Sequence, residues 1–186
     1  MRNIETIDRE KELLSQVTSG NKDAFGQLYD LYAPRLFRFI RLKVNSETLA
    51  EDLSSESFLR IWEYLQEQEK EIEETFQALL YKTARNLIID YYKRKSSQEI
   101  LISDDFQEFL SQEPAKDEIS SKEIADQIHK ALVQIKEEYQ DVLIWYYIDE
   151  LSVSEIAKML HKSQGAIRVL IHRGLASLKK HLSEQG

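Results

Sequence analysis

Polar and basic side chains between residues 164 and 173 have the types and spacing needed to contact nucleic acid. Residues four apart share one face of a helix, so Arg168 and His172 would project together and could reach base edges or phosphates in a major groove. Between Ile156 and Leu182 the chain has six lysines or arginines and no acidic residue, although its net charge is −8. A field of one sign favours a polyanionic partner. The predicted contact residues are Gln164, Arg168, Val169, His172 and Arg173.

The stretch from Leu151 to Arg173 also contains the signals for two short helices and the corner between them. Ser152 and Glu155 have the spacing of a capping box, which would start the first helix. Ser163 can cap the second helix, whose apolar stripe would pack inward. The pattern predicts a helix-turn-helix that presents the contact residues to DNA. The alternative is a helical hairpin whose lysines only keep it soluble.

A second candidate surface lies between Phe76 and Lys95, where aromatic and basic residues flank an apolar helical face. Aromatic rings beside arginine and lysine are typical of proteins that bind unpaired bases. An amphipathic helix with ordinary core tyrosines, its basic C-terminus favoured by the helix dipole, also fits the pattern. The residues expected on the polar rim are Tyr81, Lys82, Arg85, Asn86, Tyr92, Lys93, Arg94 and Lys95.

Catalytic and metal sites are not expected. The carboxylate pairs Glu73–Glu74 and Asp104–Asp105 fall in polar segments, where solvation makes them unsuited to acid–base chemistry. The chain has no cysteine, and none of its four histidines has the neighbouring ligands that would complete a metal site. There is no glycine-rich phosphate loop. We therefore expect neither an enzyme nor a cofactor.

The composition predicts an all-α protein. Five glycines and two prolines indicate long helices with few tight turns, and a hydrophobic content of 42% suffices for real cores. No run of about 18 apolar residues could span a membrane, and the first residues lack the apolar core of a signal peptide. We therefore expect a cytoplasmic protein without membrane insertion.

Helical periodicity divides the chain into two parts. We expect helices at residues 8–18, from Asn21 or Asp23 to about Ile40, at 46–65 and at 76–95, with Pro34 kinking or dividing the second and a loop or frayed turn at 66–74. Arg35, Arg38, Arg41 and Lys43 give the second helix a positive flank. The helical pattern resumes at Glu123 and runs to about Ile135, and a second helix follows through residues 139–148. The predicted organisation is one small helical domain at residues 1–95, an acidic linker at 96–122 and a second domain, containing the helix-turn-helix, at 123–186.

Three segments in this order resemble bacterial RNA polymerase sigma factors of the extracytoplasmic-function (ECF) group of the sigma-70 family, over nearly the whole chain. Residues 50–62, AEDLSSESFLRIW, resemble the segment that binds core RNA polymerase. Residues 76–95 resemble the segment that melts and reads the −10 promoter element. Glu155–Ala157, Gly165–Arg168 and His172–Arg173 resemble the helix-turn-helix that reads the −35 element.

The resemblance implies a transcription initiation factor that recruits polymerase. Its partners would be core RNA polymerase, through the β′ clamp helices and the β flap, promoter DNA, and an anti-sigma factor that holds it inactive. The implied polymerase-binding residues are Asp52, Leu53, Glu56, Phe58, Arg60 and Trp62. The implied −10 residues are Tyr81, Lys82, Arg85, Asn86, Lys93 and Arg94, and the −35 residues are Gln164, Arg168, Val169, His172 and Arg173.

The chain departs from the family pattern at several positions. Ser55 stands where glutamine is common, Leu79 where tryptophan is common, and Ala166 where threonine is common. His161 stands where the corner often has glycine, so we expect a left-handed backbone there at more cost than glycine would carry. Leu170 replaces a common arginine, which removes a DNA contact from the recognition helix.

Two other functions fit parts of the sequence. A DNA-binding regulator would share the helix-turn-helix but would not bind polymerase as a sigma subunit, and it would not require the segments at 51–62 and 81–95. An interaction module of two helical bundles would have no DNA role, and it would give no reason for the positive field between Lys158 and His181.

Overall fold

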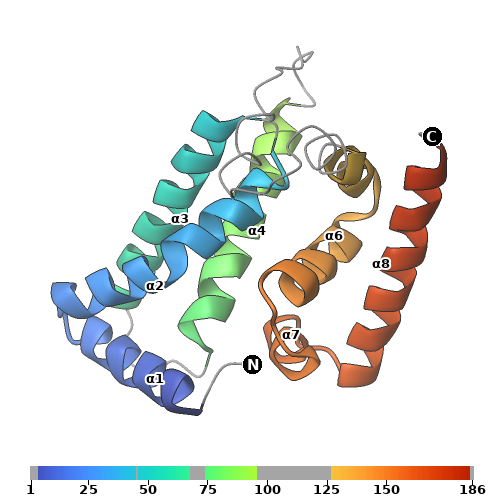
Figure 1. Cartoon of the computed structure of the whole chain (residues 1–186). Helices are drawn as coiled ribbons and strands as arrows, with labels where there is room; N and C mark the ends of the chain where they lie inside the picture. Colours follow the sequence, from blue (N-terminus) through green and yellow to red (C-terminus); the bar gives the residue numbers. More distant parts are fainter. Residues whose placement is uncertain (1–3, 45, 68–73, 96–126, 185–186) are drawn as a thin grey trace, which may run out of the picture. The chain divides into compact units, whose positions relative to one another are not determined.

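The computed structural model describes residues 4–44, 46–67, 74–95 and 127–184, and all regular secondary structure in these ranges is helical (Figure 1). The all-α prediction is confirmed. The described residues divide into two compact units, residues 4–95 and residues 127–184. The predicted linker at 96–122 and most of the predicted loop at 66–74 lie outside the described residues, and the predicted domain boundaries stay predictions. The helices are α1 (Ile4–Thr18), α2 (Lys22–Arg41), α3 (Glu47–Gln66), α4 (Phe76–Lys95), α6 (Glu137–Leu143), the π-helix η3 (Ile144–Ile148), α7 (Val153–Met159) and α8 (Gln164–Glu184).

The long helices of the first unit begin where capping residues occur in the sequence. The side chain of Asn21 accepts hydrogen bonds from the main-chain N–H groups of Asp23 and Ala24, over 3.0 and 3.1 Å, and starts α2. Ser46 Oγ accepts a hydrogen bond from the Leu49 N–H, over 3.3 Å, and starts α3. Each cap satisfies N–H groups that have no partner within the helix. Both helix starts were predicted.

Pro34 does not divide α2. Its ring removes one main-chain hydrogen bond, the one that would reach the carbonyl oxygen of Asp30. Both Pro34 and Asp30 are exposed, so water can solvate that carbonyl oxygen, and α2 continues as one helix to Arg41. Of the two predicted effects of Pro34, division of the helix does not occur, and a kink stays a prediction.

An aromatic cluster joins α2, α3 and α4. The ring centroid of Phe25 lies 5.0 Å from that of Trp62, 6.1 Å from that of Phe76 and 6.4 Å from that of Phe58, each in an edge-on arrangement. Such pairs bury large apolar areas and prefer this geometry. Helix α1 packs against the other three helices of the unit. This core fixes which faces of α3 and α4 remain exposed.

The positive flank predicted for the end of α2 is only partly present. Arg41 is fully buried and donates a hydrogen bond from Nη1 to the Val44 carbonyl oxygen, over 3.2 Å. Lys43 is also buried, and its Nζ lies 5.1 Å from the ring centroid of Phe39. A cation over an aromatic ring is attracted by the ring quadrupole. These two charges belong to the core of the unit, where they hold the end of α2.

In the second unit, α6 and η3 form one continuous helix that packs against α8. Gly174 lies at this contact, because a Cβ atom on it would stand 3.2 Å from Leu143 Cγ and 3.3 Å from Tyr139 Cβ. Residues 127–134 are helical as well. The predicted helix through residues 139–148 is present, and its last turn widens to a π-helix that leaves Tyr146, Tyr147 and Ile148 exposed.

Candidate polymerase and promoter interfaces

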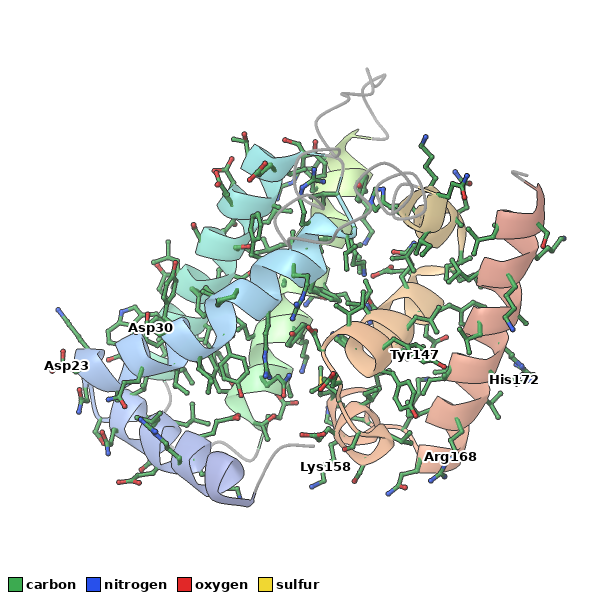
Figure 2. All side chains as sticks on the ribbon, viewed as in Figure 1. Asp23, Asp30, Tyr147, Lys158, Arg168 and His172 are labelled. Carbon is green, nitrogen blue, oxygen red and sulfur yellow. The ribbon has the colours of Figure 1, made fainter. Side chains whose placement is uncertain are left out.

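Helix α8 presents its five predicted contact residues to solvent. Gln164, Arg168, Val169, His172 and Arg173 are all exposed, whereas Ile167 and Ile171 are buried. Arg168 and His172 project outward from α8 in Figure 2. Ser163 Oγ accepts a hydrogen bond from the Ala166 N–H, over 3.2 Å, as predicted for the helix start. One face of α8 is therefore free to enter a groove.

The corner before α8 has the geometry of a helix-turn-helix. Ser152 and Glu155 form the predicted capping box: the Ser152 Oγ accepts from the Glu155 N–H over 3.2 Å, and the Glu155 carboxylate accepts from the Ser152 N–H over 2.8 Å. His161 has a φ of 50°, so the predicted left-handed backbone is present. Glu150, before α7, has a φ of 54°, which was not predicted. Lys162 Nζ also lies 3.2 Å from Glu138 Oε1, which ties the corner to α6.

Helix α4 exposes most of its predicted basic rim. Lys82, Asn86, Lys93 and Arg94 are exposed, and Arg85 is half-buried. The prediction that Tyr81 lies on this exposed rim is wrong. Its side chain is 0% exposed, and its ring packs edge-on against Phe39, with centroids 5.0 Å apart. Its position on the helix turns it toward α2, so it cannot stack on a base without leaving the core. The remaining residues form a polar, mainly basic strip.

Tyr92, near the end of α4, supports the core with its hydroxyl group. The hydroxyl donates a hydrogen bond to the main-chain carbonyl oxygen of Lys43, over 2.9 Å. Burial of the hydroxyl, with a smaller contribution from Tyr91, raises the pKa of Tyr92 above its ordinary value. The ring of Tyr92 remains partly exposed. The end of α4 is thus held against the end of α2.

The exposed face of α3 differs from the predicted polymerase-binding set. Asp52 and Arg60 are exposed, and Glu56 is half-buried. The prediction that Leu53 and Phe58 contact the polymerase directly is wrong, because their side chains are only 6% and 4% exposed. Leu53 lies in the helical core, and Phe58 packs on Tyr29, with ring centroids 4.6 Å apart. Trp62 is half-buried against Phe25, so one edge of its ring remains accessible.

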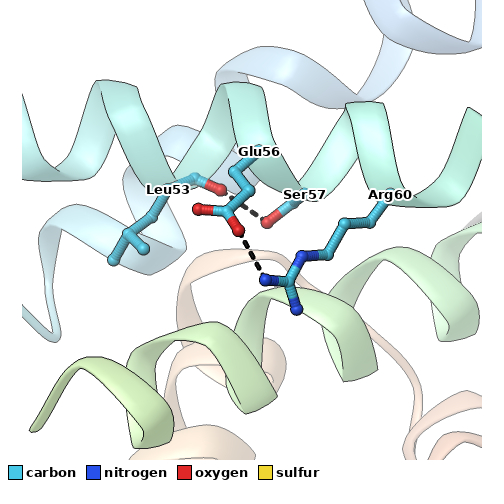
Figure 3. Close-up of polar contacts among 4 residues, drawn as sticks. All are labelled: Leu53, Glu56, Ser57 and Arg60. Carbon is cyan, nitrogen blue, oxygen red and sulfur yellow. Dashed lines mark hydrogen bonds and ion pairs between the residues drawn. The ribbon is translucent and has the colours of Figure 1, made fainter. Parts of the chain in front are cut away.

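Figure 3 shows how the polar residues of this face are arranged. Arg60 Nη2 donates to Glu56 Oε1 over 2.5 Å, one helical turn away, and forms an ion pair with it. Ser57 is buried and donates its hydroxyl hydrogen to the Leu53 carbonyl oxygen over 2.6 Å. Glu56 and Arg60 therefore lie outward while Leu53 and Ser57 lie inward.

The sequence interpretation missed Leu59 on this face. Leu59 is 56% exposed, more than any other exposed large apolar side chain in the described part of the chain. It lies three residues after Glu56 and seven after Asp52, which places the three side chains on one helical face. Its helical spacing from Asp52 and Glu56 was the signal that could have identified Leu59 as part of this surface. The prediction instead relied on the aromatic residues Phe58 and Trp62. An exposed apolar side chain with polar neighbours has the arrangement of an apolar interface centre with a polar rim.

The described part of the chain shows neither a candidate metal site nor a membrane-spanning helix. Within the described ranges, no group of three or more histidine, aspartate or glutamate residues could hold a metal ion. No helix in those ranges is long and apolar enough to cross a membrane.

Comparisons with known proteins match both units. Residues 28–98 match the family model for Sigma-70 region 2, and residues 125–178 match that for Sigma-70, region 4. The chain is 30% identical over 167 residues to the ECF RNA polymerase sigma factor SigX of Bacillus subtilis, covering 87% of this chain and 84% of that protein. It is 29% identical over 183 residues to SigW of the same organism, covering 94% and 97%.

Solved structures show the same fold. CnrH, in complex with the cytosolic domain of CnrY, aligns with a TM-score of 0.71 at 21% identity and covers 96% of this chain and 99% of that one. The sigma factor RpoE of Bartonella quintana, in complex with the anti-sigma factor NepR, aligns with a TM-score of 0.64 at 19% identity, covering 88% and 98%.

The chain belongs to the ECF group of the sigma-70 family. It is a sigma factor, which directs RNA polymerase to promoters, and not an enzyme. A regulator that does not bind polymerase is not favoured, because the chain matches region 2 in addition to the helix-turn-helix of region 4.

Proposed function

We propose that the first unit binds core RNA polymerase with α3 and the −10 element with α4, and that the second unit reads the −35 element with α8. The division into domains at 1–95 and 123–186, joined by an acidic linker at 96–122, is part of this proposal. The observation that carries it is the exposure of all five predicted −35 residues on one helix, within the residues that match region 4. The groups on α8 are long and polar or basic, as base edges and phosphates require.

The polymerase-binding surface is proposed to consist of Asp52, Glu56, Leu59 and Arg60 with the accessible edge of Trp62. The acids would face basic side chains on the partner, and Leu59 would supply the apolar contact at the centre. Interfaces of this kind combine a desolvated apolar anchor with a polar rim. Leu53 and Phe58 act indirectly, since they hold the helix that carries this surface.

The −10 surface is proposed to consist of the exposed or half-buried polar residues of α4, without Tyr81. Positive charges attract the phosphates of a separated strand, and amide groups can read the edges of unpaired bases. Unstacking a base costs a few kcal/mol, which contacts on this strip would repay. The residues are Lys82, Arg85, Asn86, Lys93 and Arg94.

A protein inhibitor is part of the proposal, because RpoE of Bartonella quintana, which shares the fold, was solved bound to an anti-sigma factor. Such a partner would cover surfaces that polymerase needs. We also propose that the protein acts in the cytoplasm, where core polymerase and promoter DNA are available.

The test is binding to core RNA polymerase followed by run-off transcription on a library of promoters. We expect stoichiometric co-elution and new transcripts whose start sites define the −10 and −35 sequences. Tight binding to duplex DNA without binding to core would overturn the proposal. An Asp52→Ala variant that binds core as the parent protein does would remove Asp52 from the polymerase-binding surface.

A further inference from the structure

Helix α1 contributes a buried carboxylate that reaches the first turn of α4. Glu10 is 3% exposed, and its Oε2 accepts a hydrogen bond from the hydroxyl of Tyr32 on α2. Its Oε1 accepts a hydrogen bond from the main-chain N–H of Gln77, 67 residues further along the chain, over 3.4 Å. Gln77 is the second residue of α4. One side chain thus joins three helices.

The Glu10 carboxylate lies among buried apolar side chains but has hydrogen-bond donors within reach. Leu13, Leu14 and Val17 of α1 are buried, and Tyr32 and Gln77 are buried as well. Burying a carboxylate is costly unless hydrogen-bond donors replace water. The N–H of Gln77 in the first turn of α4 supplies one donor, the Tyr32 hydroxyl supplies another, and the helix N-terminus adds a partial positive charge.

The carboxylate contributes to stability, but it does so in a directional way. An apolar side chain of similar volume would avoid the cost of removing a charge from water, but it would leave the buried donors of Tyr32 and Gln77 without this acceptor. The two oxygen atoms of the hydrogen-bonded carboxylate also fix the distance between the donors on α2 and α4. The position of α4 therefore depends on this side chain as well as on the packing of α1.

The start of α4 is held in two different ways. Thr75 Oγ1 accepts a hydrogen bond from the Ala78 N–H, over 3.2 Å, which defines locally where the helix begins. Glu10 instead fixes that end relative to α1 and α2. Lys82 and Asn86 project to solvent within the next turns of the same helix. A shift of the N-terminus would therefore move them together.

We propose that Glu10 is a positioning residue for promoter opening. Together with Tyr32 it holds the N-terminus of α4 in place, so that the −10 surface meets the separated strand in register. The inference rests on the proposed function of α4. The polymerase-binding face of α3 is not touched by this contact, so binding to core and opening of the −10 region should respond differently.

The test compares Glu10→Met, Glu10→Gln and Tyr32→Phe with the parent protein, all as full chains bound to saturating core polymerase. The readout is the rate at which −10 thymines become reactive to permanganate, on a promoter found by run-off transcription. We expect Glu10→Met, which removes both hydrogen bonds, to open about tenfold more slowly. Affinity for core and for −35 duplex should stay within about twofold of the parent. Glu12→Gln, an exposed glutamate on the same helix, is the matched control.

Opening at the parent rate by all three variants would overturn the inference. So would a loss of opening that only parallels a loss of core affinity, because that would mean a general loss of folded protein. If Glu10→Met does not fold, as judged by circular dichroism, Glu10→Gln and Tyr32→Phe decide, since both nearly preserve shape. Failure of the parent protein to bind core would instead overturn the proposed function and the inference with it.

Discussion

The hydroxyl of Tyr92 donates a hydrogen bond to the main-chain carbonyl oxygen of Lys43, over 2.9 Å, and so joins the ends of α4 and α2. The contact lies beside the basic strip of α4, and it links residues 49 positions apart. It also makes the stability of the first unit depend on pH, since burial raises the pKa of Tyr92.

We predict that stability falls at high pH in a way that Tyr92→Phe removes. The pKa of Tyr92 is raised above its unfolded value of about 10, so its contribution is fully present below about pH 10 and is lost as the pH rises through the folded pKa. Urea unfolding of the parent between pH 8 and pH 11.5 should show this loss. The variant should be less stable by about 1 kcal/mol at pH 8 but show a shallower decline. Equal declines would contradict the prediction, and Tyr29→Phe is the control.

Phe58 and Leu59 are neighbours in sequence but should behave in opposite ways. Phe58→Ala should destabilise the first unit by about 3–5 kcal/mol, because it leaves a cavity in the aromatic cluster. Leu59→Ala should change stability by less than about 0.5 kcal/mol and weaken binding to core polymerase by about 1–2 kcal/mol. Thermal unfolding and a titration with core distinguish the two effects. If Leu59→Ala binds core like the parent, Leu59 does not belong to the polymerase-binding surface.

Arg168 should carry sequence-specific contacts of the second unit. We predict that Arg168→Ala weakens binding to −35 duplex by about 1–3 kcal/mol if the guanidinium reads a base, with a smaller and uniform loss if it meets only phosphate. Fluorescence anisotropy on the cognate duplex and on one with substituted −35 bases separates these cases. Lys179→Ala, which removes an exposed positive charge further along α8, serves as the comparison. No change on either duplex would exclude Arg168 from the interface.

Two glycines within helices should respond differently to alanine. Gly26 in α2 has no atom within 4 Å of an added Cβ, so Gly26→Ala should stabilise the protein by about 0.5–1 kcal/mol through helix propensity. At Gly174 the added Cβ would stand 3.2–3.3 Å from side-chain atoms of Leu143 and Tyr139. Gly174→Ala should therefore gain less than Gly26→Ala, or lose stability, as strain offsets propensity. Urea unfolding of both variants measures the difference, and an equal gain would show that α6 and α8 separate without cost.

Much of the fold could be predicted because its determinants are local. Asn21, Ser46 and the pair Ser152–Glu155 start helices through hydrogen bonds within three residues. The left-handed backbone at His161 was expected from the family resemblance, because glycine is common at this corner. Apolar periodicity then gave the inward faces of α7 and α8, and with them the exposed −35 residues.

The remaining site assignments depended on long-range packing that no local pattern reveals. Leu53, Phe58 and Tyr81 lie on helices with broad apolar faces, where periodicity alone does not decide which edge is covered. Burial of Lys43 depends on the ring of Phe39, and burial of Glu10 on Tyr32 and the start of α4. Charged residues are mostly exposed in folded proteins, so the burial of Lys43 and Glu10 was not predicted.

The ion pair between Glu56 and Arg60 affects how a partner can bind the exposed face of α3. Because the carboxylate is already bound by a guanidinium one turn away, an incoming basic group must compete with Arg60. A diffuse positive surface would gain little by replacing Arg60 as the partner of Glu56. A partner with a well-placed donor for Glu56 and an apolar pocket for Leu59 would gain more. Because both side chains are about half exposed, the pair is worth only about 0.3–0.5 kcal/mol, so it weakens attraction to a basic surface slightly and leaves most of the selectivity to the apolar contact of Leu59.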